Sequence, residues 1–111
     1  MARNENKFQQ ELVKELETRF PDAIVLKNDP NYIQGIPDLT ILKGDRWAFL
    51  ECKRSSNEPY RPNQEHYLAL GASMSGYSAT IYPENKQEVL DDLERALGCR
   101  KTTKARNTRR K

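Results

Sequence analysis

Several residue types that define common classes of small protein are scarce in this sequence. It contains two cysteines, Cys52 and Cys99, which are too few for a disulfide framework and lack the close pairing of a zinc site. Its only histidine, His66, argues against catalysis centred on histidine. No apolar run approaches the ~20 residues that span a membrane, and no apolar segment of a secretory signal follows Met1. These absences favour a cytoplasmic protein without a membrane partner.

The 111 residues are enough for one domain with a modest core, and 32% of them are charged. The charge is unevenly distributed, because seven of the 19 basic residues lie in residues 100–111, which contain no acidic residue. The other 12 basic residues stand against 16 acidic ones, so residues 1–99 carry a net charge of about −4. We expect a folded domain over residues 1–99 and a disordered basic tail over residues 100–111.

The basic tail suits a polyanionic partner, because cationic side chains that neutralise phosphates release condensed counterions. It therefore points to nucleic acid, while a solvated tail that only aids solubility would have the same composition. The tail residues expected to contact nucleic acid are Lys101, Lys104, Arg106, Arg109, Arg110 and Lys111.

Residues 5–20 predict a helix, because apolar side chains recur at every fourth position. These side chains are Phe8, Leu12, Leu16 and Phe20. Pro21 ends the pattern, and residues 23–26 form a short β-rich run. Two further strand-like runs, residues 39–43 and 46–53, flank Gly44-Asp45, a pair that is typical of a two-residue hairpin turn.

The second half of the sequence predicts a helix, a strand and a final helix. Residues 54–62 are polar and predict a loop, after which a helix is expected to begin near Asn63 and to end at Ser75-Gly76. Residues 77–82 predict the last strand.

The final helix is expected to begin after Asn85, which can cap it, and to end at Gly98. Its apolar stripe consists of Val89, Leu90, Leu93 and Leu97. The resulting order, α-β-β-β-α-β-α, predicts an α/β fold in which helices flank a single mixed sheet.

The hairpin places three charged side chains together. A two-residue turn at Gly44-Asp45 sets the register of the two strands, and this register puts Asp38 directly opposite Glu51. Lys53 lies two residues beyond Glu51, so it shares the same face of the strand. An odd-length turn would shift the register by one residue and separate the three side chains.

Two carboxylates this close repel each other unless a cation lies between them. Oxygen ligands suit Mg²⁺ or Mn²⁺, which would stabilise charge on a phosphodiester under attack, and the neighbouring Lys53 could orient the attacking water. The backbone carbonyl of Cys52, between the two site residues, could be a further metal ligand. The alternative is a surface ladder of ion pairs, which the like-charged pair of Asp38 and Glu51 argues against.

Three segments carry a resemblance to a known family. They are Gly35-Ile-Pro-Asp-Leu39, Trp47-Ala-Phe-Leu-Glu-Cys-Lys-Arg54 and Arg61-Pro-Asn-Gln64. Together they resemble the PD-(D/E)XK nuclease superfamily, and more narrowly its compact VRR-NUC and Holliday-junction-resolvase-like members, many of them phage-borne. The resemblance covers roughly residues 7–97 and implies a restriction-endonuclease-like core.

The resemblance implies roles for individual residues. Asp38 and Glu51 would ligate the metal, Lys53 would activate water or stabilise the transition state, and Gln64 would support the site. Relatives often have a further acidic residue on the first helix, for which Glu11 is the candidate and Glu15 nearly as good a one. Lys27, Arg54 and Arg61 flank the inferred site and are expected to contact phosphates.

The expected function is therefore a Mg²⁺-dependent DNA endonuclease that prefers branched DNA such as Holliday junctions. The resemblance also implies a homodimer with two sites, and a bacterial host cytoplasm if the protein is phage-encoded. No small-molecule cofactor is expected. Two alternatives remain open: a catalytically silent DNA-binding module on the same scaffold, and a nuclease that cuts RNA or nicks DNA generally.

Overall fold

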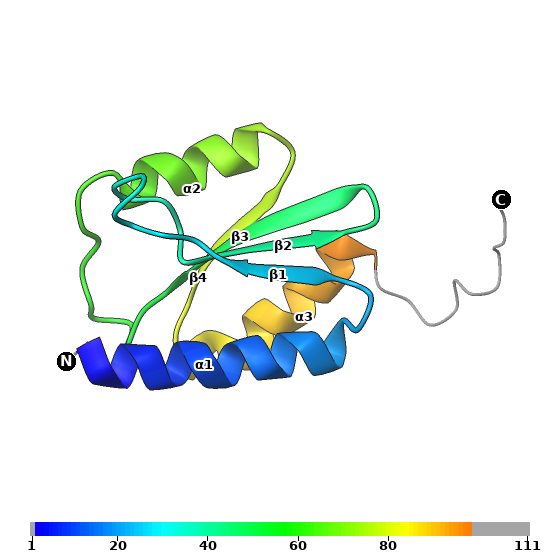
Figure 1. The fold of residues 1–111 in the computed structure, drawn as a ribbon, viewed down its shortest axis with the longest axis horizontal. Coiled ribbons are helices and arrows are strands. Elements are labelled where there is room, and N and C mark those ends of the chain that lie inside the picture. Colours follow the sequence, from blue (N-terminus) through cyan, green and yellow to red (C-terminus); the bar gives the residue numbers. More distant parts are fainter. Residues whose placement is uncertain (1, 99–111) are drawn as a thin grey trace, which may run out of the picture.

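The computed structural model describes residues 2–98, with side chains from residue 6 onward. Helices and strands follow one another along these residues in the predicted order (Figure 1). The elements are helix α1 (Ala2–Arg19), strands β1 (Ile24–Lys27), β2 (Leu39–Lys43) and β3 (Arg46–Cys52), helix α2 (Gln64–Ser73), strand β4 (Tyr77–Ile81), the 3-10 turn η1 (Pro83–Asn85) and helix α3 (Lys86–Leu97).

The four strands form one sheet in the order β1-β2-β3-β4. Strand β2 is antiparallel to both β1 and β3, whereas β4 is parallel to β3 because α2 carries the chain back along the sheet. Helices α1 and α3 cover one face of the sheet, and α2 covers part of the other (Figure 1). The structure thus confirms the predicted α/β class, the mixed sheet and the element order.

The main core lies between the sheet and helices α1 and α3. Alternate residues of the strands point to this face, as the two-residue period of a strand requires. The buried side chains are Leu12, Leu16 and Phe20 of α1 and its end, Leu39, Ile41, Ala48, Leu50, Cys52 and Ile81 of the sheet, and Val89, Leu90, Leu93 and Leu97 of α3. Burial of all these groups provides the main hydrophobic stabilisation of the fold.

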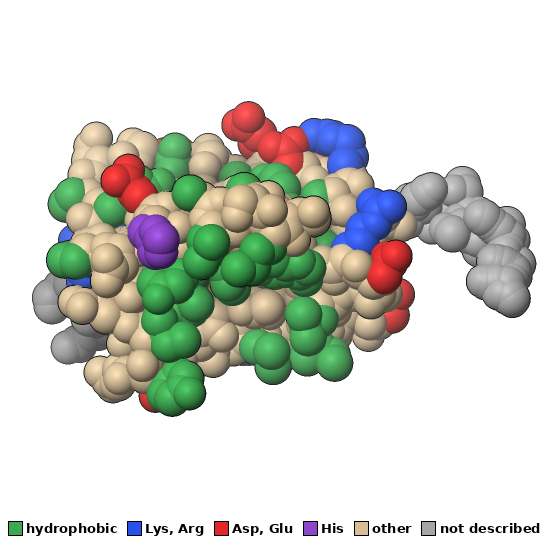
Figure 2. Space-filling view, turned by 90° about the horizontal axis from the view of Figure 1, so that it is seen from above, with side chains coloured by type: hydrophobic (Ala, Val, Ile, Leu, Met, Phe, Trp, Pro, Cys, Tyr) green, Lys and Arg blue, Asp and Glu red, His purple; other side chains and the backbone are tan. Residues whose placement is uncertain are grey.

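The opposite face of the sheet is only partly covered. Helix α2 packs closely on β3 and β4 because Gly71, which has no side chain, faces the ring of Phe49. Gly76, in the turn between α2 and β4, likewise faces the ring of Trp47. Figure 2 looks onto this side of the molecule and shows hydrophobic side chains gathered over it. The exposed large side chains include Ile24, Leu26, Leu42 and Met74. This face therefore lacks the complete cover that the other face has.

Most predicted boundaries differ from the observed ones by one to three residues. The predicted N-cap position of Asn85 is confirmed, but its side chain does not cap the helix. Instead it accepts the Tyr82 N–H at 2.8 Å and donates to the Thr80 carbonyl at 3.0 Å, so it braces the turn after β4. Gly98 ends α3 at φ 71°, as predicted.

The predicted basic tail and Cys99 lie outside the described residues. Among the helices of residues 2–98, none combines the length and the apolar character needed to cross a membrane.

Gly71 offers a test of the packing between α2 and the sheet. In an exposed helix, replacement of glycine by alanine stabilises by about 1 kcal/mol. Here a Cβ atom would meet the Phe49 ring at 2.6 Å and Ser78 Oγ at 2.7 Å. We expect Gly71→Ala to lower the free energy of unfolding by about 1–3 kcal/mol in urea denaturation.

Ser73→Ala, at an exposed position of the same helix, is the control and should change stability by less than about 0.5 kcal/mol. If Gly71→Ala were as stable as the parent protein or more so, the close packing of α2 on Phe49 would be disproved.

Candidate active site

The site begins where the pairing of β2 with β3 ends. The observed register pairs Lys43 with Arg46 and Leu39 with Leu50, as predicted from the two-residue turn. Because hydrogen-bonded pairs alternate along an antiparallel ladder, the next such pair would be Pro37 with Cys52. The ladder stops there, since the Pro37 carbonyl accepts the Asn28 side-chain amide at 2.9 Å instead.

The Asp38 side chain accepts the backbone N–H of Cys52 where the ladder ends. Its Oδ2 atom accepts the Cys52 N–H at 2.8 Å, while its own carbonyl accepts the Asn28 N–H at 2.8 Å. The carboxylate is thereby fixed beside the end of β3, next to Glu51. The predicted juxtaposition of Asp38 and Glu51 is present, and both residues line one cavity.

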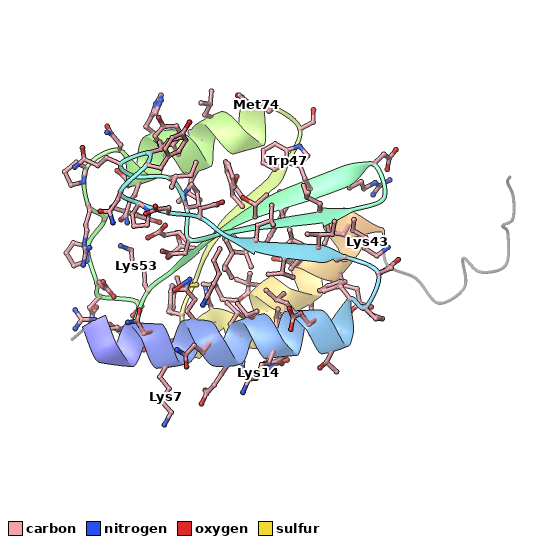
Figure 3. The ribbon with its side chains drawn as sticks, viewed as in Figure 1. Lys7, Lys14, Lys43, Trp47, Lys53 and Met74 are labelled. Carbon is pink, nitrogen blue, oxygen red and sulfur yellow. The ribbon has the colours of Figure 1, made fainter. Side chains whose placement is uncertain are left out.

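Glu51 and Lys53 are almost completely buried, with 1% and 2% of their surfaces exposed. The Lys53 ammonium lies 3.6 Å from Glu51 Oε2, so the two charges form a buried pair on one strand face, as predicted. It also donates to the Pro59 carbonyl at 3.1 Å and to Gln64 Oε1 at 2.7 Å. Figure 3 shows Lys53 inside the molecule, at the end of the sheet where residues 54–62 run.

Gln64 bridges the two charged groups. Its Oε1 atom accepts hydrogen bonds from Lys53 Nζ and from the Arg61 N–H, both at 2.7 Å, and its Nε2 atom donates to Glu51 Oε2 at 2.7 Å. These partners fix the orientation of the amide, because an ammonium can only donate and a carboxylate can only accept. The structure thus brings Gln64 to the site, as the resemblance implied.

The cavity has a volume of about 460 Å³ and contains two carboxylates, several carboxamides and one guanidinium. Its lining consists of Asn6 and Gln9 of α1, Asn28, Pro30, Gln34, Gly35, Ile36 and Asp38 from the segment between β1 and β2, Glu51 of β3, and Arg61, Pro62 and Gln64. Gly35, at φ 90°, lets its segment approach Pro62 and Asn63, since a Cβ there would lie 2.4 Å from the Asn63 Cβ. Lys53 is not part of the lining, because Gln64 and the 54–62 loop cover it.

Glu11, the candidate acidic ligand from the first helix, is not at the cavity. It lines a separate pocket of about 390 Å³ with Phe8 and Lys86, and the alternative, Glu15, pairs with Lys86 at 2.9 Å. Helical geometry explains this difference, because Gln9 and Glu11 are two positions apart and point about 200° apart around the axis. Within the described part of the chain, no three His, Cys, Asp or Glu side chains are placed to share one metal ion.

Cys52 contributes its N–H to the site through Asp38, while its side chain is buried in the main core. The cavity lining does not include it, so the structure provides no support for its carbonyl as a metal ligand.

The residues expected to contact phosphates differ in their surroundings. Arg61 is exposed and lines the cavity. Lys27 is exposed at the end of β1. Arg54 instead donates to Glu58 through its backbone N–H at 2.6 Å and its guanidinium at 3.3 Å. The six tail residues predicted to bind nucleic acid lie outside the described residues.

Burial raises the pKa of Asp38. The hydrogen bond from the Cys52 N–H and the positive charges of Lys53 and Arg61 act in the opposite direction but do not cancel this effect. The carboxylate at the cavity wall is therefore ionised at a cost in neutral solution, a cost that a bound cation would reduce.

Two carboxamide residues that α1 contributes to the lining, Asn6 and Gln9, were not predicted from the sequence. Gln9 lies one helical turn before Leu12 and Val13, so a polar residue beside the apolar stripe was the available signal. Asn28 and Gln34 belong to the loop that directly precedes Asp38, a position that by itself predicts a place at the border of the site.

No family model matches this chain, and neither the curated proteins nor the solved structures give a significant match. The site itself has two carboxylates on one wall of a cavity and a buried ammonium, which the Gln64 amide links to Glu51. This arrangement can bind a cation and polarise an oxyanion such as a phosphate.

The raised pKa of Asp38 predicts how stability depends on pH. A carboxyl group with a higher pKa in the folded than in the unfolded state destabilises the fold when ionised, and the penalty disappears as the pH falls through both values. We expect Asp38→Asn to raise the stability of the metal-free protein at pH 7 by up to about 1 kcal/mol, because Asn can still accept the Cys52 N–H.

Urea denaturation between pH 7 and pH 3, in the presence of EDTA, measures this difference, which should vanish below the unfolded pKa of about 3.9. The control is Asp45→Asn at the exposed hairpin turn. A destabilised Asp38→Asn protein at pH 7 would contradict the assignment.

Proposed function

We propose that this protein is a metal-dependent nuclease that hydrolyses phosphodiester bonds, with DNA as its substrate. The observation that carries the proposal is that Asp38, Glu51 and Gln64 line one cavity, while the buried Lys53 behind them contacts both Gln64 and Glu51. The resemblance of the three sequence segments to PD-(D/E)XK nucleases supports it, because the residues that carry the resemblance are the ones that meet here.

The donor set fits a hard divalent cation such as Mg²⁺ or Mn²⁺. Asp38 and Glu51 would hold it through carboxylate oxygens, and the carboxamides of the cavity suit the waters that Mg²⁺ retains. When bound, such an ion would supply Lewis-acid stabilisation of the charge that develops on the phosphate.

The chain's own residues have separable roles in this proposal. Lys53 neutralises the buried charge of Glu51 and holds Gln64 by its Oε1 atom, so it acts behind the cavity wall. Gln64 has a second Nε2 hydrogen, beyond the one donated to Glu51, and this group can donate to a phosphate oxygen or to the attacking water. Arg61 at the rim can bind a flanking phosphate.

We further propose that the substrate is branched DNA and that a homodimer cuts its two strands, both on the resemblance to junction resolvases. The apolar stripes of α1 and α3 are not available as the dimer interface. Leu12, Leu16, Val89, Leu93 and Leu97 are buried in the chain's own core. The exposed apolar side chains lie on the α2 side of the sheet instead.

Cleavage assays test the proposed reaction. Supercoiled plasmid, linear duplex and four-way-junction DNA are incubated with the protein and Mg²⁺ or EDTA. We expect Mg²⁺-dependent cutting, fastest on the junction, that Lys53→Met and Asp38→Asn each reduce by at least about 100-fold.

Lys14→Met is the matched control, because Lys14 points away from the sheet into solvent (Figure 3). The Asp38→Asn variant should remain folded, because it removes a charge whose burial is unfavourable. A loss of its activity would therefore not be due to unfolding. Salt-sensitive junction binding without cleavage at any divalent ion would favour the silent DNA-binding module, and cutting of RNA alone would replace DNA as the substrate.

Deletion of residues 100–111 tests the tail. Removal of seven positive charges should weaken DNA binding and reduce the slope of log affinity against log salt by several units, at about 0.9 for each lost phosphate contact. Fluorescence anisotropy measures the slope between roughly 50 and 200 mM salt, because affinities that depend on phosphate contacts fall steeply over this range. An unchanged slope would mean that the tail serves only solubility.

A further inference from the structure

Lys53 owes its burial to the 54–62 loop. It follows the last residue of β3, at an end of the sheet where a long side chain would ordinarily reach solvent, yet it is only 2% exposed. The cover consists of Pro59, whose carbonyl accepts the ammonium at 3.1 Å, and Tyr60, whose ring centroid lies 5.4 Å from Nζ. The next residue, Arg61, donates its N–H to Gln64. Three consecutive residues thus contact the Lys53–Gln64 pair.

Tyr60 attaches this cover to the sheet. Its hydroxyl shares a hydrogen bond of 2.6 Å with the hydroxyl of Thr80 on β4. Thr80 is paired with Glu51 in the β3–β4 register, so the attachment point is directly beside the buried carboxylate. The hydroxyl of Tyr60 therefore links the loop to the strand next to the site.

The loop has a second brace at its other end. Glu58 accepts the backbone N–H and the guanidinium of Arg54. Burial raises the pKa of Glu58, but these hydrogen bonds together with the positive charges of Lys53 and Arg54 leave it below its ordinary value. That brace fixes residues 54–58, whereas residues 59–61 are held by Lys53, Gln64 and the Tyr60–Thr80 bond. Since 41% of Tyr60 is exposed, its contribution to the core does not account for its position.

We infer that Tyr60 is a positioning residue: its bond to Thr80 holds residues 59–61 over Lys53, which keeps the ammonium on Gln64 Oε1 and the Gln64 amide directed at Glu51. A catalytic role for this arrangement rests on the proposed function, whereas the holding of residues 59–61 over Lys53 by Tyr60 does not. Without the bond, water reaches Lys53 and competes for its hydrogens, and the Gln64 amide loses the partner that fixes its orientation.

Chemical accessibility of Lys53 tests the cover. Each protein is treated briefly with acetic anhydride, and mass spectrometry measures acetylation of the peptide that contains Lys53. We expect Lys53 to react slowly in the parent protein and at least about 5-fold faster in Tyr60→Phe and in Thr80→Val, an opening free energy of about 1 kcal/mol for one lost hydrogen bond. Both replacements keep the size of the side chain and remove only the shared hydrogen bond.

The double variant shows whether the two hydroxyls act together. If they form one bond, Tyr60→Phe combined with Thr80→Val should give no more acetylation than either single change, because the bond is lost only once. Tyr32→Phe is the matched control, since Tyr32 is 85% exposed and lies in another loop.

The side-chain NH₂ signals of Gln64 report on its orientation in ¹H–¹⁵N NMR spectra. They should shift in Tyr60→Phe and Thr80→Val and remain unchanged in Tyr32→Phe. In cleavage assays the same two variants should lower kcat by about 10-fold with little change in KM, because the loop does not contribute binding contacts through Tyr60.

The outcomes separate this inference from the proposed function. Unchanged acetylation or unchanged Gln64 signals in Tyr60→Phe would overturn the inference, whether or not the protein cuts DNA. Altered signals with unaltered kcat would reduce Tyr60 to a structural residue and overturn its positioning role. A parent protein that cuts nothing, with both signals altered in the variants, would overturn the nuclease and leave Tyr60 as the residue that positions Lys53 and Gln64.

Discussion

The buried pair of Lys53 and Glu51 imposes its requirements on the structure around it. Two charges removed from water are tolerated only when their hydrogen-bonding groups are satisfied nearby, and removal of one partner costs about 3–5 kcal/mol. Gln64 forms hydrogen bonds with both groups, and the Pro59 carbonyl accepts another ammonium hydrogen. The ring of Tyr60 lies over the ammonium. Residues 59–61 of the loop and Gln64 at the start of α2 supply these partners.

The end of the β2–β3 ladder turns this buried pair into a site. Pro37 cannot donate a hydrogen bond, and its carbonyl is bound by Asn28, so the ladder opens and Asp38 takes the Cys52 N–H. The second carboxylate is thereby held at a cavity wall rather than in the core. The carboxylates of Asp38 and Glu51 thus line the cavity, while the ammonium that balances Glu51 stays behind its wall.

Local patterns were sufficient for much of this molecule. The recurrence of Phe8, Leu12, Leu16 and Phe20 predicted α1, and the Gly44-Asp45 turn predicted a register that the structure confirms. Patterns failed where the decision was not local. Asn85 has the composition and place of a helix cap, but the carbonyl of Thr80 and the N–H of Tyr82 bind its side chain instead. The periodicity of a helix does not indicate whether a neighbouring turn competes for the hydrogen bonds of its cap residue.

The sequence by itself determined the element order, the hairpin register and the meeting of Asp38, Glu51 and Lys53, because a turn length and a two-residue period fix which side chains share a face. Only the tertiary structure decided what surrounds them. Gln9 rather than Glu11 reaches the cavity, because the orientation of α1 on the sheet selects which side of the helix faces it. Likewise, Lys53 lies behind Gln64, since contacts among residues distant in sequence set its burial.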